Sequence, residues 1–408
     1  LVSRGAAGRS LAILLEYPGQ HELSSSVQVN STGSRRSKAE NTVCVGLLGA
    51  GNYVKSTLLP AMKTVAGTEM VGICAASGLS AAQSATRGGF SFATTDAQDI
   101  IANSKVNTIV IATRHHLHAQ QVIAALGAGK HIFCEKPLCL HEGELQEIIF
   151  AYEAASEISR PVFMVGFNRR FAPLTVELKQ FVAEVREPLL MSYRVNAGSL
   201  ASSHWANDPA QGGGRIVGEV CHFVDLMTFL CGSQAVQVFA TATPNAYGCS
   251  PDNANLHITF ANGSTGVITY ATNGHKLFPK ERLEVFAQGR VAVLDDFCEL
   301  ELVSGANRRK RRSLFRVDKG HNAEWRAMVQ SVLNGGPAPI PCSEIVATTR
   351  ATIRMLDSLR SGRPEPVQLE LRNASPPGST AVQPPTVRNG SWSGDSRGDG
   401  LSERRFGR

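Results

Sequence analysis

The stretch Val43-Cys44-Val45-Gly46-Leu47-Leu48-Gly49-Ala50-Gly51-Asn52 decides the fold. Its first six residues form a continuous apolar run, which is typical of a strand buried on both faces of a parallel sheet. A glycine turn follows, and a helical pattern then continues to Ala66. The order strand, glycine turn, helix is the context that a dinucleotide-binding fingerprint requires.

The glycine turn predicts how a dinucleotide would bind. Gly49 allows the tight turn, and Gly51 lets a pyrophosphate approach the backbone. The backbone amides at the helix start, at Asn52 and Tyr53, would hold the phosphates. Val54 stands where a third glycine is usual, which affects helix–strand packing but leaves the phosphate contacts in place. We therefore expect NAD or NADP as cofactor.

The first half of the chain alternates strands and helices. Strands are predicted at 69–74, 108–112, 131–134 and 161–165, and helices from Ser80 and over 118–126 and 142–155. Continuous apolar strands that alternate with helices indicate an α/β fold, with a Rossmann-type doubly wound parallel sheet covered on both faces.

The second half changes to an α+β pattern with an open, mostly antiparallel sheet. Strands are predicted at 189–195, 236–242, 256–260, 266–270, 283–286 and 292–294, and helices at 215–230, 321–334 and 343–361, the last two closing this domain. The predicted organisation is a linker or remnant of an upstream domain at 1–42, a nucleotide-binding domain at 43–165, a substrate and oligomerisation domain at 166–372, and a disordered tail at 373–408.

The positive charge lies at the periphery. The 408 residues include 41 Lys+Arg and 34 Asp+Glu, a net charge of +7. The segments 1–42 and 373–408 carry +2 each and the run Arg308–Arg312 adds +5, so the rest of the chain is net −2. This distribution gives no extended basic face for nucleic acid. We interpret the basic run as a solvated hairpin tip between Leu302-Val303 and Leu314-Phe315.

Cysteine usage and hydropathy indicate a cytoplasmic protein without a membrane span. The nine cysteines are scattered, form no CxxC pair and sit among apolar neighbours, as reduced core cysteines do. No apolar run approaches the roughly 18 residues of a transmembrane helix. The histidines of His115-His116-Leu117-His118 have no carboxylate or thiolate nearby, so no metal site is predicted.

Candidate site residues follow the predicted strands at their carboxyl ends, where ligands bind in doubly wound sheets. Thr113 and His118 follow one strand, and Glu135-Lys136-Pro137 follows the next. A lysine there can polarise a substrate hydroxyl or carbonyl, although a surface lysine beside a turn proline is an equal alternative. Residues 73–78 contain no carboxylate for the adenosine ribose, which favours NADP, or use of both cofactors, over strict use of NAD. Ser77 and Arg87 are the candidate partners for a 2′-phosphate, with an exposed helix residue as an equal alternative for Arg87.

The predicted helix at 215–230 carries Glu219, His222 and Asp225 at spacings of three, close to one face. A histidine beside a carboxylate can accept a proton while hydride leaves a carbinol. The alternative is a polar stripe on a half-buried helix. The preceding triple glycine, 212–214, favours a functional role because it permits close backbone approach to a ligand.

Taken together, these motifs resemble the Gfo/Idh/MocA oxidoreductase family. The resemblance covers about 43–372 and rests on Gly49-Ala50-Gly51-Asn52, Ala112-Thr113 with Leu117-His118-Ala119, Ala128-Gly129-Lys130-His131, Glu135-Lys136-Pro137, Gly166-Phe167-Asn168-Arg169-Arg170-Phe171 with Pro173, and the glycines before His222. It implies a Rossmann domain, a second domain whose open sheet forms a homo-oligomer interface, and NAD(P)-dependent oxidation or reduction of sugars, inositols and related polyols.

The resemblance also assigns roles. Lys136 is similar to the family's active-site lysine, Glu135 to its contact with the nicotinamide ribose, and His222 to its acid/base histidine. Arg170 is similar to an arginine that lines the domain junction and binds cofactor. The family usually has Asp four residues before the histidine, where this chain has Gly218, and Glu219 could take over from the same helix face.

A closer resemblance is to bidomain oxidoreductases, which join a zinc-type alcohol dehydrogenase domain to a Gfo/Idh/MocA half. The segment Ser10–Pro18 resembles the end of such a domain, so the chain is expected to be the C-terminal half of a longer protein. His204-Trp205 and Gly213–Glu219 fit the same subgroup, in which Gly218-Glu219 is ordinary.

The sequence thus predicts an NAD(P)-dependent dehydrogenase of a carbohydrate-like secondary alcohol or its ketone. His204, Trp205, Arg215 and His321 are the weaker candidates for substrate contacts. The first alternative is a non-catalytic NAD(P)-binding sensor or partner-binding protein on the same fold. The second is redox-neutral glycosidic cleavage with transient hydride transfer.

Overall fold

The computed structural model describes residues 24–29, 42–244, 252–313 and 317–368. The described residues belong to one compact unit. The segment Ser10–Pro18, the tail predicted at 373–408 and the pair Leu314-Phe315 lie outside the described residues.

The first sheet has seven strands in the order β1-β4-β3-β2-β5-β6-β7. All neighbours are parallel except β1 and β4. β2 lies at the centre and is buried along its whole length, as its apolar run predicted. The strands are β1 (Ser26–Gln28), β2 (Val43–Leu48), β3 (Thr68–Cys74), β4 (Phe92–Thr94), β5 (Thr108–Ile111), β6 (His131–Cys134) and β7 (Phe163–Val165).

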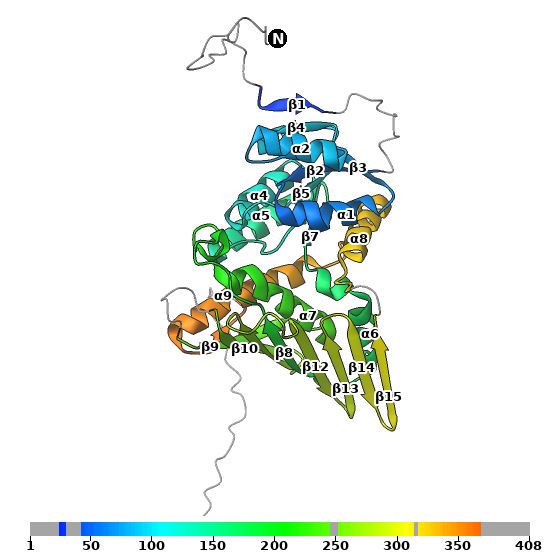
Figure 1. Ribbon diagram of the computed structural model, residues 1–408, viewed down its shortest axis with the longest axis vertical. Coiled ribbons are helices and arrows are strands. Elements are labelled where there is room, and N and C mark those ends of the chain that lie inside the picture. The colour runs from blue at the N-terminus through cyan, green and yellow to red at the C-terminus, as the bar shows by residue number, and fades with distance from the viewer. Residues whose placement is uncertain (1–23, 30–41, 245–251, 314–316, 369–408) are drawn as a thin grey trace, which may run out of the picture. The chain divides into compact units, whose positions relative to one another are not determined.

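Helices accompany the strands of this sheet, so the predicted doubly wound α/β fold is confirmed (Figure 1). They are η2 (Val54–Leu58), α1 (Leu59–Lys63), α2 (Gly78–Gly88), α3 (Ala97–Ile101), η3 (His115–Leu117), α4 (His118–Gly127) and α5 (Glu142–Ile158). η2 is a wide π-helical turn that leads directly into α1, where Pro60 has no amide to donate.

Two expectations for this half were wrong in detail. The first helix ends at Lys63 rather than Ala66, because the Thr64 hydroxyl bonds back to the Ala61 carbonyl and Gly67 adopts a φ of +83°. Part of the predicted linker at 1–42 is also a strand, since β1 pairs with the edge strand β4. Its side chains are all exposed, so backbone hydrogen bonding forms it without an apolar pattern.

The second sheet has nine strands in the order β15-β14-β13-β12-β8-β11-β10-β9-β16. It is antiparallel except where β8 meets β11, and its buried and exposed residues alternate, as in β10. The predicted open, mostly antiparallel sheet is confirmed. Its strands are β8 (Leu190–Asn196), β9 (Ala235–Ala242), β10 (Ala254–Phe260), β11 (Thr265–Ala271), β12 (Glu281–Ala287), β13 (Arg290–Asp295), β14 (Glu299–Ser304), β15 (Asn307–Arg312) and β16 (Glu365–Pro366).

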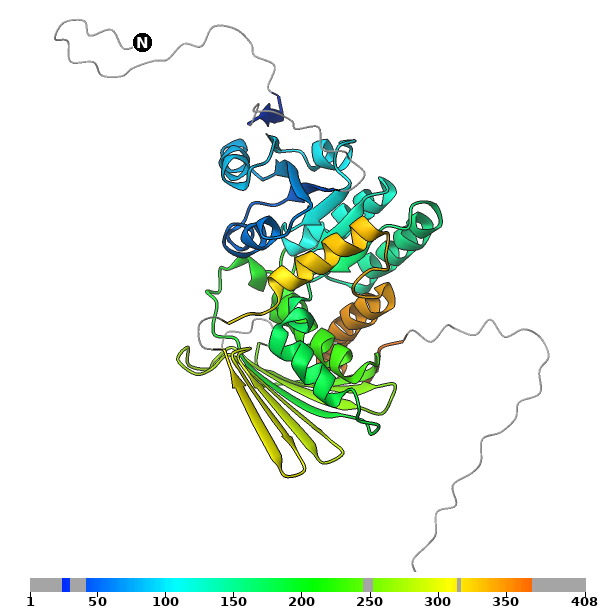
Figure 2. The same ribbon diagram turned by 90° about the vertical axis from the view of Figure 1, so that its right-hand side faces the viewer.

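Of the helices in this half, α6, α7 and α9 lie on one face of the nine-stranded sheet, and Figures 1 and 2 show no described helix on the opposite face. The elements are η4 (Asn168–Phe171), α6 (Pro173–Val182), η5 (Trp205–Asn207), η6 (Ile216–Val220), α7 (Cys221–Cys231), α8 (His321–Asn334) and α9 (Cys342–Ser361). η6 is a second π-helical turn and runs directly into α7.

The helix α8 does not close the second domain as predicted. Its fully buried Trp325, with Met328 and Val329, belongs to the hydrophobic core of the first sheet. The Trp325 indole N–H donates to the Thr68 hydroxyl at 3.2 Å, and its ring meets Phe133 edge-on at 5.7 Å. The apolar face of this helix therefore completes the Rossmann core across a long chain separation.

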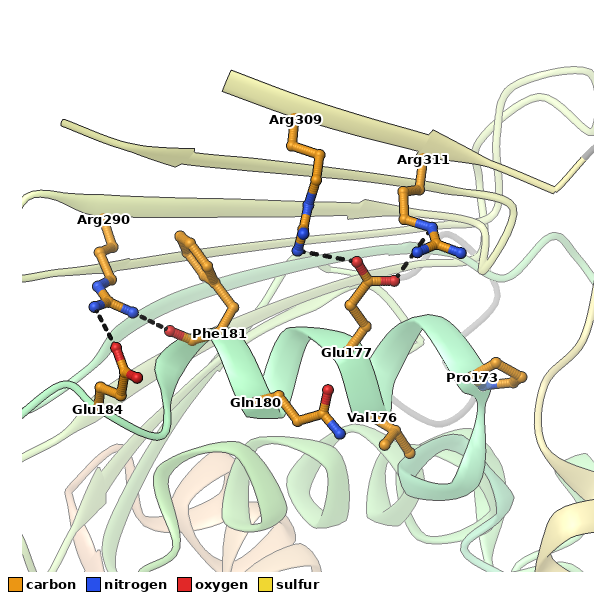
Figure 3. A pocket seen from close by; sticks show the side chains of 9 residues that line it. All are labelled: Pro173, Val176, Glu177, Gln180, Phe181, Glu184, Arg290, Arg309 and Arg311. Atoms are coloured by element: carbon orange, nitrogen blue, oxygen red, sulfur yellow. Dashed lines mark hydrogen bonds and ion pairs between the residues drawn. The ribbon is translucent and has the colours of Figure 1, made fainter. Parts of the chain in front are cut away.

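The basic run is also placed differently from the prediction. Residues 308–312 do not form a hairpin tip; they lie in β15, an exposed edge strand that pairs with β14. Arg309 and Arg311 both reach Glu177 of α6, at 3.1 and 3.4 Å. These residues line a groove of about 560 Å³, in which Arg290 pairs with Glu184 (Figure 3). Two alternate side chains of the basic strand are thus paired with one carboxylate of α6.

Candidate active site

The glycine turn after β2 has the geometry of a phosphate cradle. Gly49 has a φ of +107°, and a Cβ there would lie 2.3 Å from the Ala112 carbonyl oxygen. A Cβ at Gly51 would meet nothing within 4 Å. The first glycine is therefore required by the backbone, while the second leaves open space beside the chain, into which a ligand can come.

The helix that begins at Asn52 faces the same space. Its bond from the Lys55 amide to the Gly51 carbonyl, 3.2 Å long, is the first of the helical ladder. The amides before Lys55 precede that ladder and point out of the helix start, where they attract anions. The open position at Gly51 and these amides together fit a dinucleotide pyrophosphate.

Glu135 directly follows the carboxyl end of β6, and its side chain is buried. A Cβ at Gly166 would come within 3.0 Å of the Glu135 Oε2, so this glycine makes room for the carboxyl group. Burial raises the pKa of Glu135 to about 7, although Lys136 and a hydrogen bond with Tyr53 oppose the shift. Its Oε1 atom is buried and accepts no hydrogen bond from the described residues. An unpaired buried acceptor of this kind fits a ribose hydroxyl.

Lys136 connects the two halves of the site. Its Nζ atom donates to the Gly218 carbonyl at 3.0 Å, so a cation from the end of β6 reaches the turn η6 that precedes His222. The peptide bond between Lys136 and Pro137 is cis.

His222 is a buried, neutral imidazole. Burial and the nearby cations Arg169 and Lys136 hold its pKa well below the ordinary range. Its Nδ1 atom is buried without a hydrogen bond to the described residues, and the Phe167 ring meets it edge-on at 6.4 Å. A neutral histidine can accept a proton, and a substrate hydroxyl would satisfy an unpaired ring nitrogen.

The structure does not bring Glu219, His222 and Asp225 together as their spacing suggested. The Glu219 carboxylate pairs with Arg215 at 3.0 Å and accepts from the Tyr270 hydroxyl at 3.0 Å. Burial opposes its ionisation, but Lys136 and Arg215 outweigh burial and lower its pKa. The wide turn η6 rotates the helix between Glu219 and His222, so regular α-helical spacing does not apply.

Arg170 and Asp225 form a structural ion pair. Their shortest contact is 2.5 Å, and the same guanidinium reaches Glu344 of α9 at 3.0 Å. Arg170 thereby cross-links three elements, η4, α7 and α9. Its donors are engaged, so direct cofactor binding by Arg170 is not favoured.

His118 holds two loops in place. It is buried, and its ring nitrogens lie 2.7 Å from the Pro137 carbonyl and 3.2 Å from the Thr113 carbonyl. These contacts favour a positioning role for His118 over the predicted cofactor contact. The ring aligns the loops that carry Thr113 and Lys136. The Thr113 hydroxyl itself donates to Gln121 at 2.7 Å.

Ser77 stands beyond the end of β3 as the N-cap of α2, where its hydroxyl accepts from the Ser80 amide at 3.3 Å. It is exposed, as a contact to the adenosine half of a dinucleotide requires. Asp96, which caps α3 in the loop after β4, is close enough to contribute to the raised pKa of Cys74. A carboxylate from the loop after β4 thus lies near the carboxyl end of β3.

The weaker substrate candidates divide into two groups. Trp205 packs its ring edge-on against His115 with centroids 4.7 Å apart, and His204 lies beside it. The ring of His321, at the start of α8, lies 6.2 Å from the Tyr53 ring beside the glycine turn. Arg215 is buried against Tyr270 and Glu219, so it shapes the site without a free donor facing it.

Three site residues were missed. Arg169 is the largest cationic influence on His222 and pairs with Glu281 at 2.8 Å. Tyr270 connects Arg215 with Glu219. His115 lies against Gly218. Arg169 is adjacent to Arg170, and His115 lies between Thr113 and His118, so the motifs around those predicted site residues contain both. Tyr270 lies in a strand whose pattern does not distinguish it from the other residues.

In the described part of the chain, no group of three or more His, Cys, Asp or Glu side chains could hold a metal ion. No helix there is long and apolar enough to cross a bilayer. The cysteines of the described ranges are free thiols.

Two family models match the chain. One describes an oxidoreductase family with an NAD-binding Rossmann fold and matches residues 43–167; the other describes the Gfo/Idh/MocA C-terminal domain and matches 178–290. Together they cover more than half of the chain in the expected order. The protein belongs to the Gfo/Idh/MocA family of oxidoreductases.

Curated relatives act on sugars and cyclitols. Levoglucosan dehydrogenase of Pseudarthrobacter phenanthrenivorans is 30% identical over 225 residues, which are 48% of this chain and 57% of the relative. Inositol 2-dehydrogenase of Acidothermus cellulolyticus is 26% identical over 336 residues, 79% of this chain and 94% of that relative. The matched part of 1,5-anhydro-D-fructose reductase of Ensifer adhaerens is 58% of its length. The chain thus spans about half the length of several of these relatives.

Solved structures share the fold. A levoglucosan dehydrogenase in complex with NADH and levoglucosan superposes with a TM-score of 0.72 at 23% identity, covering 80% of this chain and 100% of the other. An oxidoreductase domain protein from Kribbella flavida gives 0.72 at 20% identity, covering 81% and 100%.

Proposed function

We propose that this protein is an NAD(P)-dependent dehydrogenase that interconverts a secondary alcohol of a sugar, inositol or related polyol with its ketone. One observation carries the proposal. The Lys136 ammonium reaches the Gly218 carbonyl at 3.0 Å, which places it beside the turn that leads into the buried, neutral His222. A cation thus contacts the turn that leads into a neutral base, and the names of the relatives support the substrate class.

The residues divide the chemistry between them. Gly49, Gly51 and the amides at Asn52 and Tyr53 would hold the pyrophosphate, and Glu135 the nicotinamide ribose. The bound nicotinamide supplies a hydride acceptor at C4. Lys136 would orient the substrate oxygen and stabilise its developing negative charge, while His222 takes the hydroxyl proton. Because its pKa is lowered, His222 starts unprotonated at neutral pH.

The cofactor preference proposed is NADP over NAD. Residues 75–78, directly after β3, contain no carboxylate to bind the ribose 2′-hydroxyl, and Ser77 is exposed there. The group that opposes this preference is the carboxylate of Asp96, which lies in the loop after β4, near the end of β3. Titration with both nucleotides tests the preference: Asp96→Asn should strengthen NADP binding relative to NAD, and tighter NAD binding by the unmodified protein would contradict the proposal.

Partners and location follow from the same reasoning. The substrate is a small carbohydrate-like molecule, and the free cysteines favour the cytoplasm. The second sheet leaves one face without a described helix, which we propose as the interface of a homo-oligomer (Figure 2).

Lys136→Ala is the decisive variant for the proposed function. We expect turnover of polyols to fall by about 100-fold or more, because one preorganised cation contributes roughly that much to charge stabilisation. NADH binding, followed by fluorescence titration, should be retained since the glycine turn is unchanged. A panel of myo-inositol, levoglucosan and D-glucose provides the substrates, and equal turnover by variant and wild type would reject the role of Lys136.

A further inference from the structure

The starting point is the absent side chain at Gly218. A Cβ built there would lie 3.1 Å from Cε1 and 3.6 Å from Nδ1 of His115. The distance to Cε1 is tighter than most Cβ contacts, and the distance to Nδ1 is an ordinary van der Waals contact. The ring of His115, which comes from the loop after β5, therefore occupies the space that a side chain at position 218 would need.

His115 is held in this place from several sides. Its Nδ1 atom lies 2.8 Å from the Gly212 carbonyl oxygen, and Trp205 meets its ring edge-on at 4.7 Å. The segment that supplies both contacts is itself tightly folded, since a Cβ at Gly212 would come within 2.4 Å of the Ala206 backbone. The imidazole is thus fixed between a loop of the first sheet and a loop of the second domain.

The contacts determine which nitrogen is free. A carbonyl oxygen only accepts hydrogen bonds, so Nδ1 carries the proton. Burial lowers the pKa of His115 to about 3, helped by Lys136 and His118, so the ring is neutral. Nε2 then bears a lone pair, and no hydrogen bond between the described residues uses it. His115 offers an acceptor beside the Lys136 donor.

Lys136 and His115 meet the same residue. The lysine ammonium bonds to the carbonyl of Gly218, and the imidazole packs where its side chain would be. The Glu219 carboxylate of the same turn is less free, since it already binds Arg215 and Tyr270. A donor and an acceptor that both lie against Gly218 match two neighbouring hydroxyl groups of one molecule.

We propose that His115 is a substrate-binding residue that accepts a hydrogen bond from the hydroxyl next to the one held by Lys136, which makes the site selective for vicinal diols. This inference rests on the proposed dehydrogenase function. It names a residue of the first domain as a determinant of specificity, in place of the side chain missing at Gly218.

The test compares a polyol with its deoxy analogue. The wild type is assayed with the substrate it oxidises fastest among myo-inositol, levoglucosan and D-glucose, and with the analogues that lack a hydroxyl on either carbon next to the oxidised one. We expect kcat/KM for one analogue to be about tenfold lower or more, the size of one buried hydrogen bond. In His115→Ala this ratio should fall close to one, mainly through KM, because the acceptor is absent for both substrates.

Two further variants separate specificity from structural damage. His115→Gln keeps an acceptor and should recover part of the discrimination. His116→Ala is the matched control: it removes the next histidine, whose ring contact with the Gln211 carbonyl is long at 3.4 Å, and it should keep the wild-type ratio. NADH affinity should be unchanged in His115→Ala, His115→Gln and His116→Ala. Gly218→Ala, which pushes a methyl group against the ring, should reduce the discrimination independently.

The possible failures are distinguishable. If the wild type discriminates and His115→Ala discriminates equally, or if the variant loses activity on both substrates in proportion, His115 does not read the second hydroxyl and the inference is overturned alone. If the wild type oxidises no polyol of the panel, the proposed function fails and this inference fails with it.

Discussion

Two glycines of the same turn serve opposite purposes at the scale of single residues. In Gly49→Ala the new methyl group would overlap the Ala112 carbonyl and the residue would keep a positive φ. We expect a loss of about 1–3 kcal/mol from backbone strain, with more from the clash, measured as a lower free energy of unfolding in urea.

Gly51→Ala is the matched comparison, because its methyl group would meet no protein atom within 4 Å. Stability should stay within about 0.5 kcal/mol of wild type, while NADH affinity falls because the methyl group fills the phosphate space. A stable Gly49→Ala variant, or a Gly51→Ala variant with normal NADH affinity, would contradict this account of the turn.

Glu135 gives the cofactor-free protein a defined pH dependence. Burial raises its folded pKa from 4.5 to about 7, so the folded state binds more protons than the unfolded state between these values. Stability contributed by this group is therefore present below about pH 4.5 and is lost as pH rises toward 7, by about 3 kcal/mol.

The measurement is the difference between unfolding free energies of wild type and Glu135→Gln across pH 4.5 to 8. The neutral amide cannot ionise, so the variant should lack the decline seen in wild type. Parallel profiles for the two proteins would show that Glu135 titrates normally.

The sequence identifies candidate site residues that lie in short local motifs, but it does not identify contact partners that are distant in the chain. Gly49, Glu135, Lys136 and His222 stand in short, ordered motifs that the sequence alone makes visible. The pairing of Arg170 with Asp225 spans 55 residues, so no spacing rule could predict it.

At the scale of elements, α8 makes a testable contribution to a core far from it in sequence. Trp325→Ala removes a fully buried indole that contacts Phe133 and Thr68. We expect a destabilisation of about 3–5 kcal/mol. The exposed neighbour Arg326 supplies the control, since Arg326→Ala should change stability by less than about 0.5 kcal/mol. Urea unfolding followed by circular dichroism measures both, and equal effects would refute the packing role.

Element prediction succeeded where burial imposes a regular pattern. The continuous apolar run of β2 and the alternation of β10 were readable. β15 was missed as a strand, because its six residues are exposed and mostly basic, and it forms only through pairing with β14 and ion pairs to neighbouring carboxylates. The π-helical turns η2 and η6 have no periodic signature and were not predicted.

At the scale of the whole molecule, the open sheet face leads to a prediction about assembly. Leu190 and Phe286 are cross-strand partners that are 54% and 39% exposed. If this face joins subunits, Phe286→Asp buries a charge at the interface and should shift the oligomer toward monomer by more than about tenfold in dissociation constant. Sedimentation velocity measures the shift.

Leu79→Asp is the control for that experiment, because Leu79 is 72% exposed on α2, outside the second sheet. It should leave the assembly unchanged. A monomeric wild type would reject the proposed interface, and dissociation by both variants would indicate nonspecific association.

The position of α8 also bears on how the molecule is made. Thr68 and Trp325, which share a hydrogen bond, are 257 positions apart. During synthesis the nucleotide-binding half leaves the ribosome first, yet its core lacks Trp325, Met328 and Val329 until the helix emerges. We expect the nascent first half to remain loosely packed and protease-sensitive over that interval, since non-local contacts close late. The two halves of this enzyme would then complete their folding together, although their sequences form two successive domains.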